Sequence, residues 1–226
     1  RANEGHDDGC AIIPVMGASP RRGPGRPSAG NSAETRQRIV SAARDVFSEF
    51  GYGAATFQEI ADRAGLTRPA INHYFPSKQA LFRAVLTQST RLSLREGTDR
   101  GRTASTLVDQ VSAVVDTAVQ AAGRDAALAG FMVTAMLESR RHHGLVPPEL
   151  EALPQLRRFL AGAVGEAIAR GELVTEADPE SLTELLAALM WGVAFYAGYI
   201  GDQAQLEDVA AQFRLLLAGR LWQLRN

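Results

Sequence analysis

From Glu34 onward, apolar residues recur at intervals of three or four positions, which is the spacing of one face of an α-helix. The first helical segment begins at Glu34. It is expected to end at Gly51 and Gly53, because glycine favours the left-handed turn that ends helices. Its predicted apolar face comprises Ile39, Ala43, Val46, Phe47 and Phe50. We find no alternating strand pattern longer than four residues, so the pattern predicts an all-α protein.

Three shorter helices follow, each preceded by a hydroxyl side chain that can accept a backbone N–H at the helix start. Thr56, with Glu59 three positions later, predicts a capping box. Thr67 and Ser77 predict the starts of the next two helices. The second helix ends at Gly65, the third ends before Pro76, and the fourth runs to about Leu94.

The rest of the chain shows long helical patterns interrupted by glycine and proline. The predicted helices cover about 105–121, 125–141, 149–170, 179–200 and 204–224. A polar segment at 97–105 is the expected joint between two unequal parts. About nine helices and three regions result: a flexible basic tail at 1–33, a three-helix domain at 34–96 and a larger helical domain at 97–226.

Residues 185–201 form a run of 17 residues without a charge. A membrane-spanning helix needs about 20 apolar residues. This run is bounded by Glu184 and Asp202 and has no flanking Lys or Arg. We therefore expect a helix that is buried from two sides in a soluble protein, with no membrane partner.

Charge is distributed unevenly, although the net charge of the 226 residues is only -1. Residues 16–95 hold 12 Lys/Arg and 5 Asp/Glu, whereas residues 96–226 hold 11 and 17. A basic first third and an acidic remainder favour an anion-binding module joined to a body with another task. The single cysteine, Cys10, excludes a disulfide framework and a cysteine-based metal site within one chain.

The first residues show no signal-peptide pattern. The apolar run at 11–15 is short and follows two aspartates instead of a basic segment. Met16 is a candidate translation start, in which case residues 1–15 are upstream or vector-derived; the sequence leaves this open.

Residues 56–75, TFQEIADRAGLTRPAINHYF, carry the spacing that a helix-turn-helix requires. Ala61 is small enough for two helices to cross closely, and Gly65 suits the left-handed turn between them. Ile71 is the apolar anchor that holds the second helix against the first. This segment is therefore the candidate anion-binding module.

The second helix of this unit has a polar surface. Pro69 lies in its first turn, where backbone N–H groups have no intrahelical acceptor. Asn72, His73 and Tyr74 lie beyond the anchoring residues and have no obvious partner in the chain. Amides and imidazoles can contact base edges, and hydroxyls can contact phosphates, so this surface suits double-stranded DNA.

Residues 34–86 resemble the DNA-binding domain of the TetR family of bacterial transcriptional repressors. The residues that carry the resemblance are RQRIVSAARDVFSEFGY, TFQEIADRAGLTRPAINHYF and PSKQALF, in this order. They cover about a quarter of the chain. The C-terminal part resembles the family only in its length and helical pattern.

The resemblance implies roles for individual residues. Phosphate contacts are implied for Thr56, Thr67, Tyr74 and Lys78, and major-groove contacts for Arg68, Ala70, Asn72 and His73. Many relatives have an aromatic residue or glycine where this chain has Asn72 and Pro69. That departure leaves the operator sequence open.

The basic tail contains Arg21, Arg22 and Arg26 in the segment RRGPGRP, which resembles an AT-hook. An arginine such as Arg26 is favoured electrostatically in a narrow A·T minor groove. The alternative is a solvated tail that adds only nonspecific attraction to DNA.

The resemblance also implies a ligand pocket among the middle helices and dimerisation. Aromatic and methionine side chains in the acidic body favour an apolar or amphipathic effector, although core packing is the more common role for each of them taken singly. The candidate pocket residues are Phe131, Met132, Met136, Phe159, Trp191, Phe195 and Tyr196. Small residues at 187–198 and an apolar final helix with Leu215 and Trp222 predict a homodimer through the last two helices.

Enzyme chemistry has no visible carrier in the sequence, and no cofactor or metal is expected. There is no Ser/His/Asp set, no paired acid in an apolar segment and no HExxH. Residues 140–143, Arg-Arg-His-His, with Glu138 one turn before His142, could bind a metal or an anionic ligand. The alternative is that these basic residues only complement the negative end of a helix.

We therefore expect a cytoplasmic, homodimeric repressor that binds a palindromic operator and is released by a small apolar or amphipathic molecule. Within the same class, a regulator without an inducer, or an activator, remains an alternative. A DNA-anchored enzyme and a nonspecific chromosome-coating protein are the alternatives from other classes.

Overall fold

A computed structural model of the chain describes residues 29–200 and 202–221. Every regular element in this part is helical, which confirms the all-α prediction. The helices are α1 (Ala29–Ala54), α2 (Phe57–Ala64), α3 (Arg68–Tyr74), α4 (Lys78–Thr90), the π-helical turn η1 (Arg91–Arg95), α5 (Glu96–Gly101), α6 (Leu107–Arg124), α7 (Ala126–Arg141), the 3-10 turn η2 (Pro148–Leu150), α8 (Ala152–Ala169), α9 (Pro179–Ile200) and α10 (Gln203–Leu217).

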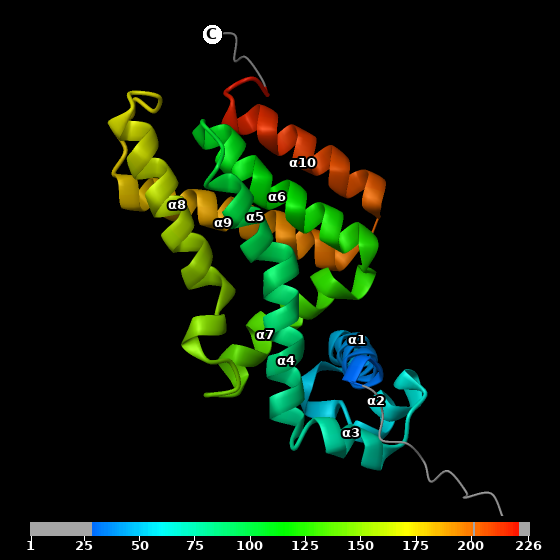
Figure 1. The fold of residues 1–226 in the computed structure, drawn as a ribbon. Coiled ribbons are helices and arrows are strands. Elements are labelled where there is room, and N and C mark those ends of the chain that lie inside the picture. Colours follow the sequence, from blue (N-terminus) through cyan, green and yellow to red (C-terminus); the bar gives the residue numbers. More distant parts are fainter. Residues whose placement is uncertain (1–28, 201, 222–226) are drawn as a thin grey trace, which may run out of the picture.

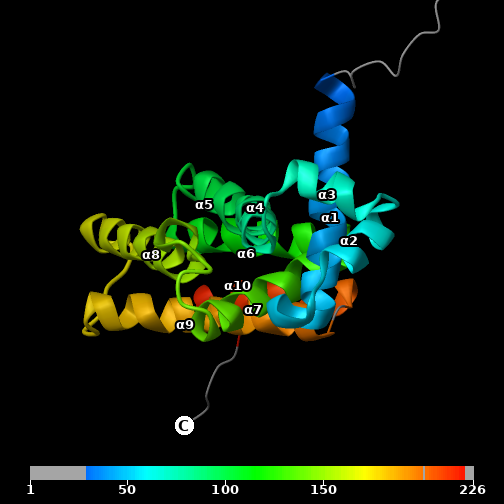
Figure 2. The ribbon, with the colours of Figure 1, turned by 90° about the horizontal axis from the view of Figure 1, so that it is seen from below.

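The helices form two groups joined by α4 and α7. Figure 1 shows α1, α2 and α3 at one end of the molecule and α6, α8, α9 and α10 at the other, with α4 and α7 between them. The view from below, in Figure 2, shows the same division and the first turns of α1 projecting away from the body. The larger group is therefore connected to the helix-turn-helix by two elements.

Two hydrophobic clusters match the two groups. The first fills the space between α1, α2, α3 and α4, and it includes the buried side chains of Phe47, Phe82 and Ile71. Phe131 and Ala135 of α7 belong to this first cluster. The second cluster lies between α6, α8, α9 and α10. Because α7 packs into the first cluster, the helix-turn-helix group shares its core with the body.

The expected joint at 97–105 is wrong in its first half. The chain continues from α4 through η1 into α5 without leaving helical conformation, and the break comes only after Gly101. A Cβ atom at Gly97 would lie 2.8 Å from Val114 Cα, and one at Gly101 would lie 2.7 Å from Gln110 O. These glycines therefore permit close helix packing against α6 and do not mark a linker.

The last helix ends earlier than predicted. α10 stops at Leu217 instead of about 224, and Gly219 follows with a φ of +64°. Arg220 N–H donates to Leu215 O at 2.8 Å, and Gly219 N–H donates to Leu216 O at 3.0 Å. This bonding pattern is a glycine-terminated helix end, which the run of three leucines before Gly219 obscures in the sequence. Trp222 lies outside the described residues.

α9 is the one helix among the described residues that is long and apolar enough to cross a membrane, by length and composition alone. The core helix of a soluble protein passes the same test. Leu186, Ala187 and Met190 are buried in the second cluster, but Leu185 and Tyr199 are 54% and 81% exposed. The expectation of burial on two sides is therefore wrong for the single chain, in which one face of α9 is uncovered.

Candidate nucleic-acid interface and internal cavity

The predicted capping box at the start of α2 is present. Glu59 N–H donates to Thr56 Oγ1 at 3.2 Å, and Thr56 N–H donates to Glu59 Oε2 at 2.8 Å. Gly65 has a φ of +62° and ends α2 in the left-handed conformation. Its turn is closed by Leu66 N–H, which donates to Ala61 O at 2.9 Å. These local bonds fix the angle at which α3 leaves α2.

The recognition-helix candidate, α3, is held by few side chains. Thr67 caps it by accepting from Ala70 N–H at 3.4 Å, and Pro69 lies in its first turn as predicted. Ile71 is fully buried against α2. Phe75, directly after the helix, is also buried. The exposed side chains of this seven-residue helix, those of Arg68, Pro69, Asn72 and His73, can contact another molecule.

Most of the expected DNA contacts lie on the outer surface of this unit. Arg68, Asn72 and His73 are exposed on α3, whereas Ala70 and Tyr74 are partly buried. The rings of His73 and Tyr74 meet edge to face, with centroids 5.3 Å apart. Thr56 and Thr67 are exposed at the starts of α2 and α3. Arg26 lies outside the described residues.

Lys78, for which the family resemblance implies a phosphate contact, makes three hydrogen bonds within the chain. Its ammonium group donates to Tyr52 O at 2.7 Å, Gly53 O at 3.0 Å and Ala55 O at 2.9 Å. Burial lowers the pKa of Lys78, and the carboxylates of Glu138 and Glu59 oppose that shift. All three donors are thus used at the end of α1, where carbonyl groups lack helical partners. In this structure the Lys78 ammonium group therefore joins the end of α1 to the start of α4.

Two arginines of α1 support the helix-turn-helix and were missed from the sequence. Arg38 Nη2 donates to Ala64 O, the last carbonyl of α2, at 2.6 Å. The Arg36 guanidinium lies 4.9 Å from the centre of the Phe75 ring, which follows α3. Each contact joins residues far apart in the chain, so no local pattern indicated them. They tie the projecting part of α1 to both helices of the unit.

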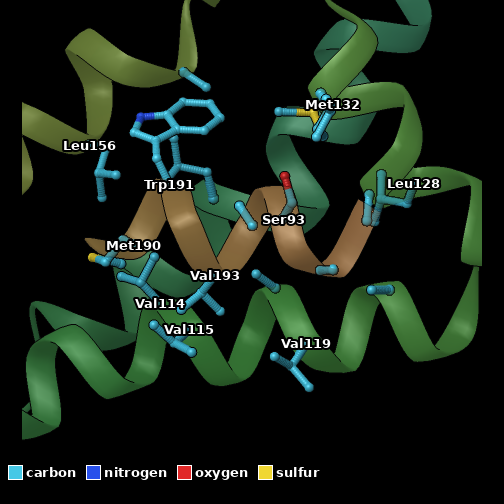
Figure 3. Close-up of a pocket in the computed structure, with 18 residues that line it drawn as sticks. Ser93, Val114, Val115, Val119, Leu128, Met132, Leu156, Met190, Trp191 and Val193 are labelled. Atoms are coloured by element: carbon cyan, nitrogen blue, oxygen red, sulfur yellow. The ribbon is translucent and has the colours of Figure 1, made fainter. Parts of the chain in front are cut away.

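The body contains a cavity of about 100 Å³ between η1, α6, α7, α8 and α9. Figure 3 shows Trp191 of α9 and Met132 of α7 on opposite sides of its upper edge, with Ser93 between them. Valine, alanine and leucine side chains form most of its wall; the labelled ones in Figure 3 are Val114, Val115, Val119, Leu128, Leu156 and Val193. None of the described residues that line it carries a charge. The cavity therefore suits a hydrocarbon group.

The cavity offers few polar atoms. Ser93 Oγ donates to Ser89 O at 2.8 Å. Trp191 Nε1 is buried and has no hydrogen-bond partner among the described residues. A buried donor without a partner is costly, so this N–H is available to an acceptor that enters the site.

A second depression, of about 610 Å³, adjoins the cavity and is called the polar groove below. It shares Met132, Ala152 and Trp191 with the cavity, and it adds Met136. Its polar and charged side chains are Ser139, Arg140, His143, Glu151 and Arg157. The basic residues at the end of α7 thus lie beside the cavity, although no group of His, Cys, Asp or Glu that could hold a metal is found in the described part of the chain.

Three of the seven expected pocket residues lie at these two sites: Met132 and Trp191 at both, and Met136 in the polar groove. Phe131 is elsewhere, because it is fully buried with Phe82 at a ring distance of 5.3 Å. Phe159 lines a different, polar depression next to Gly101.

Phe195 and Tyr196 also lie away from the cavity. Phe195 is 51% exposed on the outer face of α9. The Tyr196 hydroxyl lies 3.5 Å from Gln205 Oε1 on α10. The valines and alanines that do form the wall were missed, because in sequence they are indistinguishable from ordinary core residues.

α7 contacts both functional regions. Met132 and Val133 line the cavity, whereas Phe131 and Ala135 pack in the core of the helix-turn-helix group. Near its end, buried Glu138 accepts from Arg141 at 3.2 Å and lies 3.1 Å from His142 Nε2. The His142 ring in turn meets the Tyr52 ring of α1, with centroids 5.5 Å apart. A movement of α7 would therefore change both its contacts with α1 and the shape of the cavity wall.

Comparison with known proteins agrees with this division. The family description "Bacterial regulatory proteins, tetR family" matches residues 39–85, and "Tetracyclin repressor-like, C-terminal domain" matches residues 107–213. The two matches fall on the helix-turn-helix group and on the body that holds the cavity.

Individual relatives are transcriptional regulators. The activator FasR of Mycolicibacterium smegmatis is 40% identical over 93 residues, a match that spans 42% of FasR. The regulator UidR of Escherichia coli K12 is 26% identical over 159 residues, which cover 70% of this chain and 79% of UidR.

A solved relative extends the likeness to the whole fold. The structure of Salmonella enterica GusR is 25% identical and covers 83% of this chain and 95% of its own, with a TM-score of 0.61. The two family descriptions together match most of the helix-turn-helix group and most of the body. The protein belongs to the TetR family of bacterial transcriptional regulators.

Proposed function

We propose that this regulator is a cytoplasmic homodimeric repressor that binds a palindromic operator through α3 and is released by a small molecule bound in the body. The observation that carries the proposal is the exposed surface of Arg68, Asn72 and His73 on a helix anchored by Ile71. Such side chains can donate to and accept from base edges in the major groove. An enzymatic activity forms no part of the proposal.

The uncovered face of α9 supports a dimer through the last two helices. Leu185, Ala188, Gly192, Phe195 and Tyr199 are exposed at intervals of three or four residues, which places them on one stripe of the helix. An apolar stripe of this kind favours burial against another surface. A two-fold axis through it would pair the same stripe of two chains. Such a dimer would place two copies of α3 on one DNA molecule, about 34–36 Å apart when the half-sites are one turn apart.

The position of α7 supports a route from ligand to DNA. A ligand that displaces Met132 or Val133 acts on the same helix whose Phe131 and Ala135 pack against α1 and α4. Release requires that the ligand bind more tightly to the state in which the two copies of α3 are misplaced. Tight binding to both states alike would leave operator affinity unchanged.

The first test is a selection from genomic DNA fragments, including the region upstream of the protein's own coding sequence, at about physiological salt with excess competitor DNA. The proposal expects recovery of one palindromic site, whose binding is weakened by Asn72→Ala. Binding that is uniform across fragments and disappears with modest salt would mean phosphate attraction alone, and the operator proposal would then be wrong.

An activator is the second candidate, because the relative FasR is named a transcriptional activator. A reporter gene placed behind the recovered site separates the two. Repression expects higher reporter output when the protein is absent, and activation expects lower output. The same DNA-binding surface serves either sign, so this result leaves the operator proposal intact.

A further inference from the structure

The apolar cavity and the polar groove meet at one partition. Met132, Ala152 and Trp191 line both, and Figure 3 shows the Met132 side chain pointing toward the Trp191 ring. On one side of the partition, the described residues of the cavity wall are all uncharged. On the other side, the groove collects charged side chains from the end of α7 and the start of α8. A molecule that crosses the partition would have one apolar and one polar end.

The formally charged side chains of the groove are two arginines and one carboxylate, and this excess of positive charge favours an anion over a cation. Arg140, His143 and Arg157 lie there together with one carboxylate, that of Glu151. Arg157 is already paired with Glu184 at 2.6 Å. Arg140 is exposed and makes no ion pair among the described residues. One guanidinium with its donors unused is therefore available beside the partition.

We propose that the cavity and the groove form one binding site for an amphiphilic anion, with an unbranched hydrocarbon chain in the cavity and the anionic head group near Arg140. The inference rests on the proposed function in taking this site as that of the effector. It gives the basic segment 140–143 a role as an anion contact. Trp191 lines both sites, and its buried N–H, which has no hydrogen-bond partner among the described residues, can donate to an oxygen of the ligand or of a water that accompanies it.

The volume of the cavity limits the length of the ligand's hydrocarbon chain. A cavity of about 150 Å³ holds a benzene molecule. At about 100 Å³, this cavity takes roughly four carbon atoms without expansion. Further methylene groups would span the partition to reach the groove. An anion with a chain of about six to eight carbons therefore fits best.

The test uses the full chain with Trp222→Phe, which leaves Trp191 as the only tryptophan of the two in the sequence. Octanoate, 1-octanol and octyltrimethylammonium are titrated below their micelle concentrations, by calorimetry and by Trp191 emission. The proposal expects octanoate to bind most tightly and to shift the emission. Affinity should fall about fourfold for each methylene removed between octanoate and hexanoate.

Three variants locate the head group. Arg140→Ala should weaken octanoate about threefold to fivefold and leave 1-octanol unchanged. Glu151→Gln removes the opposing carboxylate and should strengthen octanoate. The matched control is Arg158→Ala, an exposed arginine that lines the separate depression beside Phe159 and makes no ion pair in the described chain. It should change neither probe.

The outcomes separate this inference from the proposed function. Equal or tighter binding of 1-octanol or octyltrimethylammonium, or an Arg140→Ala effect of equal size on all probes, would overturn the inference. Those results leave operator binding untouched. Octanoate binding with the expected preferences but without any change in operator affinity would support the ligand class and contradict release by this site.

Discussion

The helix-turn-helix group and the cavity-bearing body differ in the sequence separation of the contacts that form them. In the first, short-range bonds fix the geometry: the Thr56 capping box, the left-handed Gly65 and the Thr67 cap all join residues within a few positions of one another. In the second, the site is a space left between η1, α6, α7, α8 and α9, whose walls come from distant segments. A helix-turn-helix group whose geometry is set by local bonds is thus attached to a body that contains a cavity. Side chains of α7 pack in the core of the first and line the cavity of the second.

Ile71→Ala should have the largest effect, because this residue is fully buried and anchors α3. The lost burial and the residual cavity should lower the free energy of unfolding by about 3 kcal/mol, measured by urea denaturation. Operator affinity should fall by more than the folded fraction accounts for. The control is Val115→Ala in the second cluster, which should destabilise the protein while the folded molecules keep their operator affinity.

Asn72→Ala should separate binding from stability. Asn72 is exposed on α3 and has no hydrogen bond to another described residue, so the unfolding free energy should stay within about 0.5 kcal/mol. Operator affinity should fall by about 2 kcal/mol, roughly thirtyfold, because a bidentate base contact is lost. Fluorescence anisotropy on the recovered operator gives the change. An unaltered affinity would place base reading elsewhere on α3.

An Ala→Val substitution should lower the free energy of unfolding more in the core of the helix-turn-helix group than at the wall of the cavity. Ala43→Val adds two methyl groups inside the filled core of α1 and should destabilise by about 1.5 kcal/mol. Ala118→Val adds them at the cavity wall, where space exists, and should cost much less. Both residues lie within helices, so helix propensity cancels in the comparison. Equal costs by urea denaturation would contradict the contrast between a filled core and an unfilled one.

Lys78→Met should have the smallest effect of the four, about 1 kcal/mol of stability, because the side chain is only partly buried. The loss arises from three carbonyls at the end of α1 that no longer accept from an ammonium group. Operator affinity per folded molecule should stay nearly constant. A large drop in affinity without loss of stability would instead support the phosphate contact that the family resemblance implies.

The sequence predicted the two regions unequally, for the same physical reason. Caps, the Gly65 turn and the Ile71 anchor depend on neighbours in the chain, so they could be read from residues 56–75. Arg36 and Arg38 escaped notice because their partners lie 26 or more residues away. In the body, aromatic content was a poor guide to the cavity. Phe131 filled a core and Phe195 faced outward, while small aliphatic residues formed the wall.

The helix boundaries show the same limit. The helix starts predicted at Thr56, Thr67 and Ser77 agree with the structure, because each of these residues caps its helix with its own side chain. Gly97 suggested a linker, yet its role is set by α6, which packs so closely that no Cβ would fit. Glycine can be required because a neighbouring helix leaves no space for a Cβ atom, or because the backbone forms a left-handed turn. Only the tertiary structure shows which of these reasons applies at a given position.

A hydroxyl-radical footprint on the recovered operator tests the central claim most directly, namely that two copies of α3 on one dimer read one site. The account predicts two protected backbone segments related by a two-fold axis, with centres about 10 base pairs apart or a multiple of that spacing. Asn72→Ala should weaken both segments equally. A single protected segment, or continuous protection that spreads along the DNA with protein concentration, would contradict it.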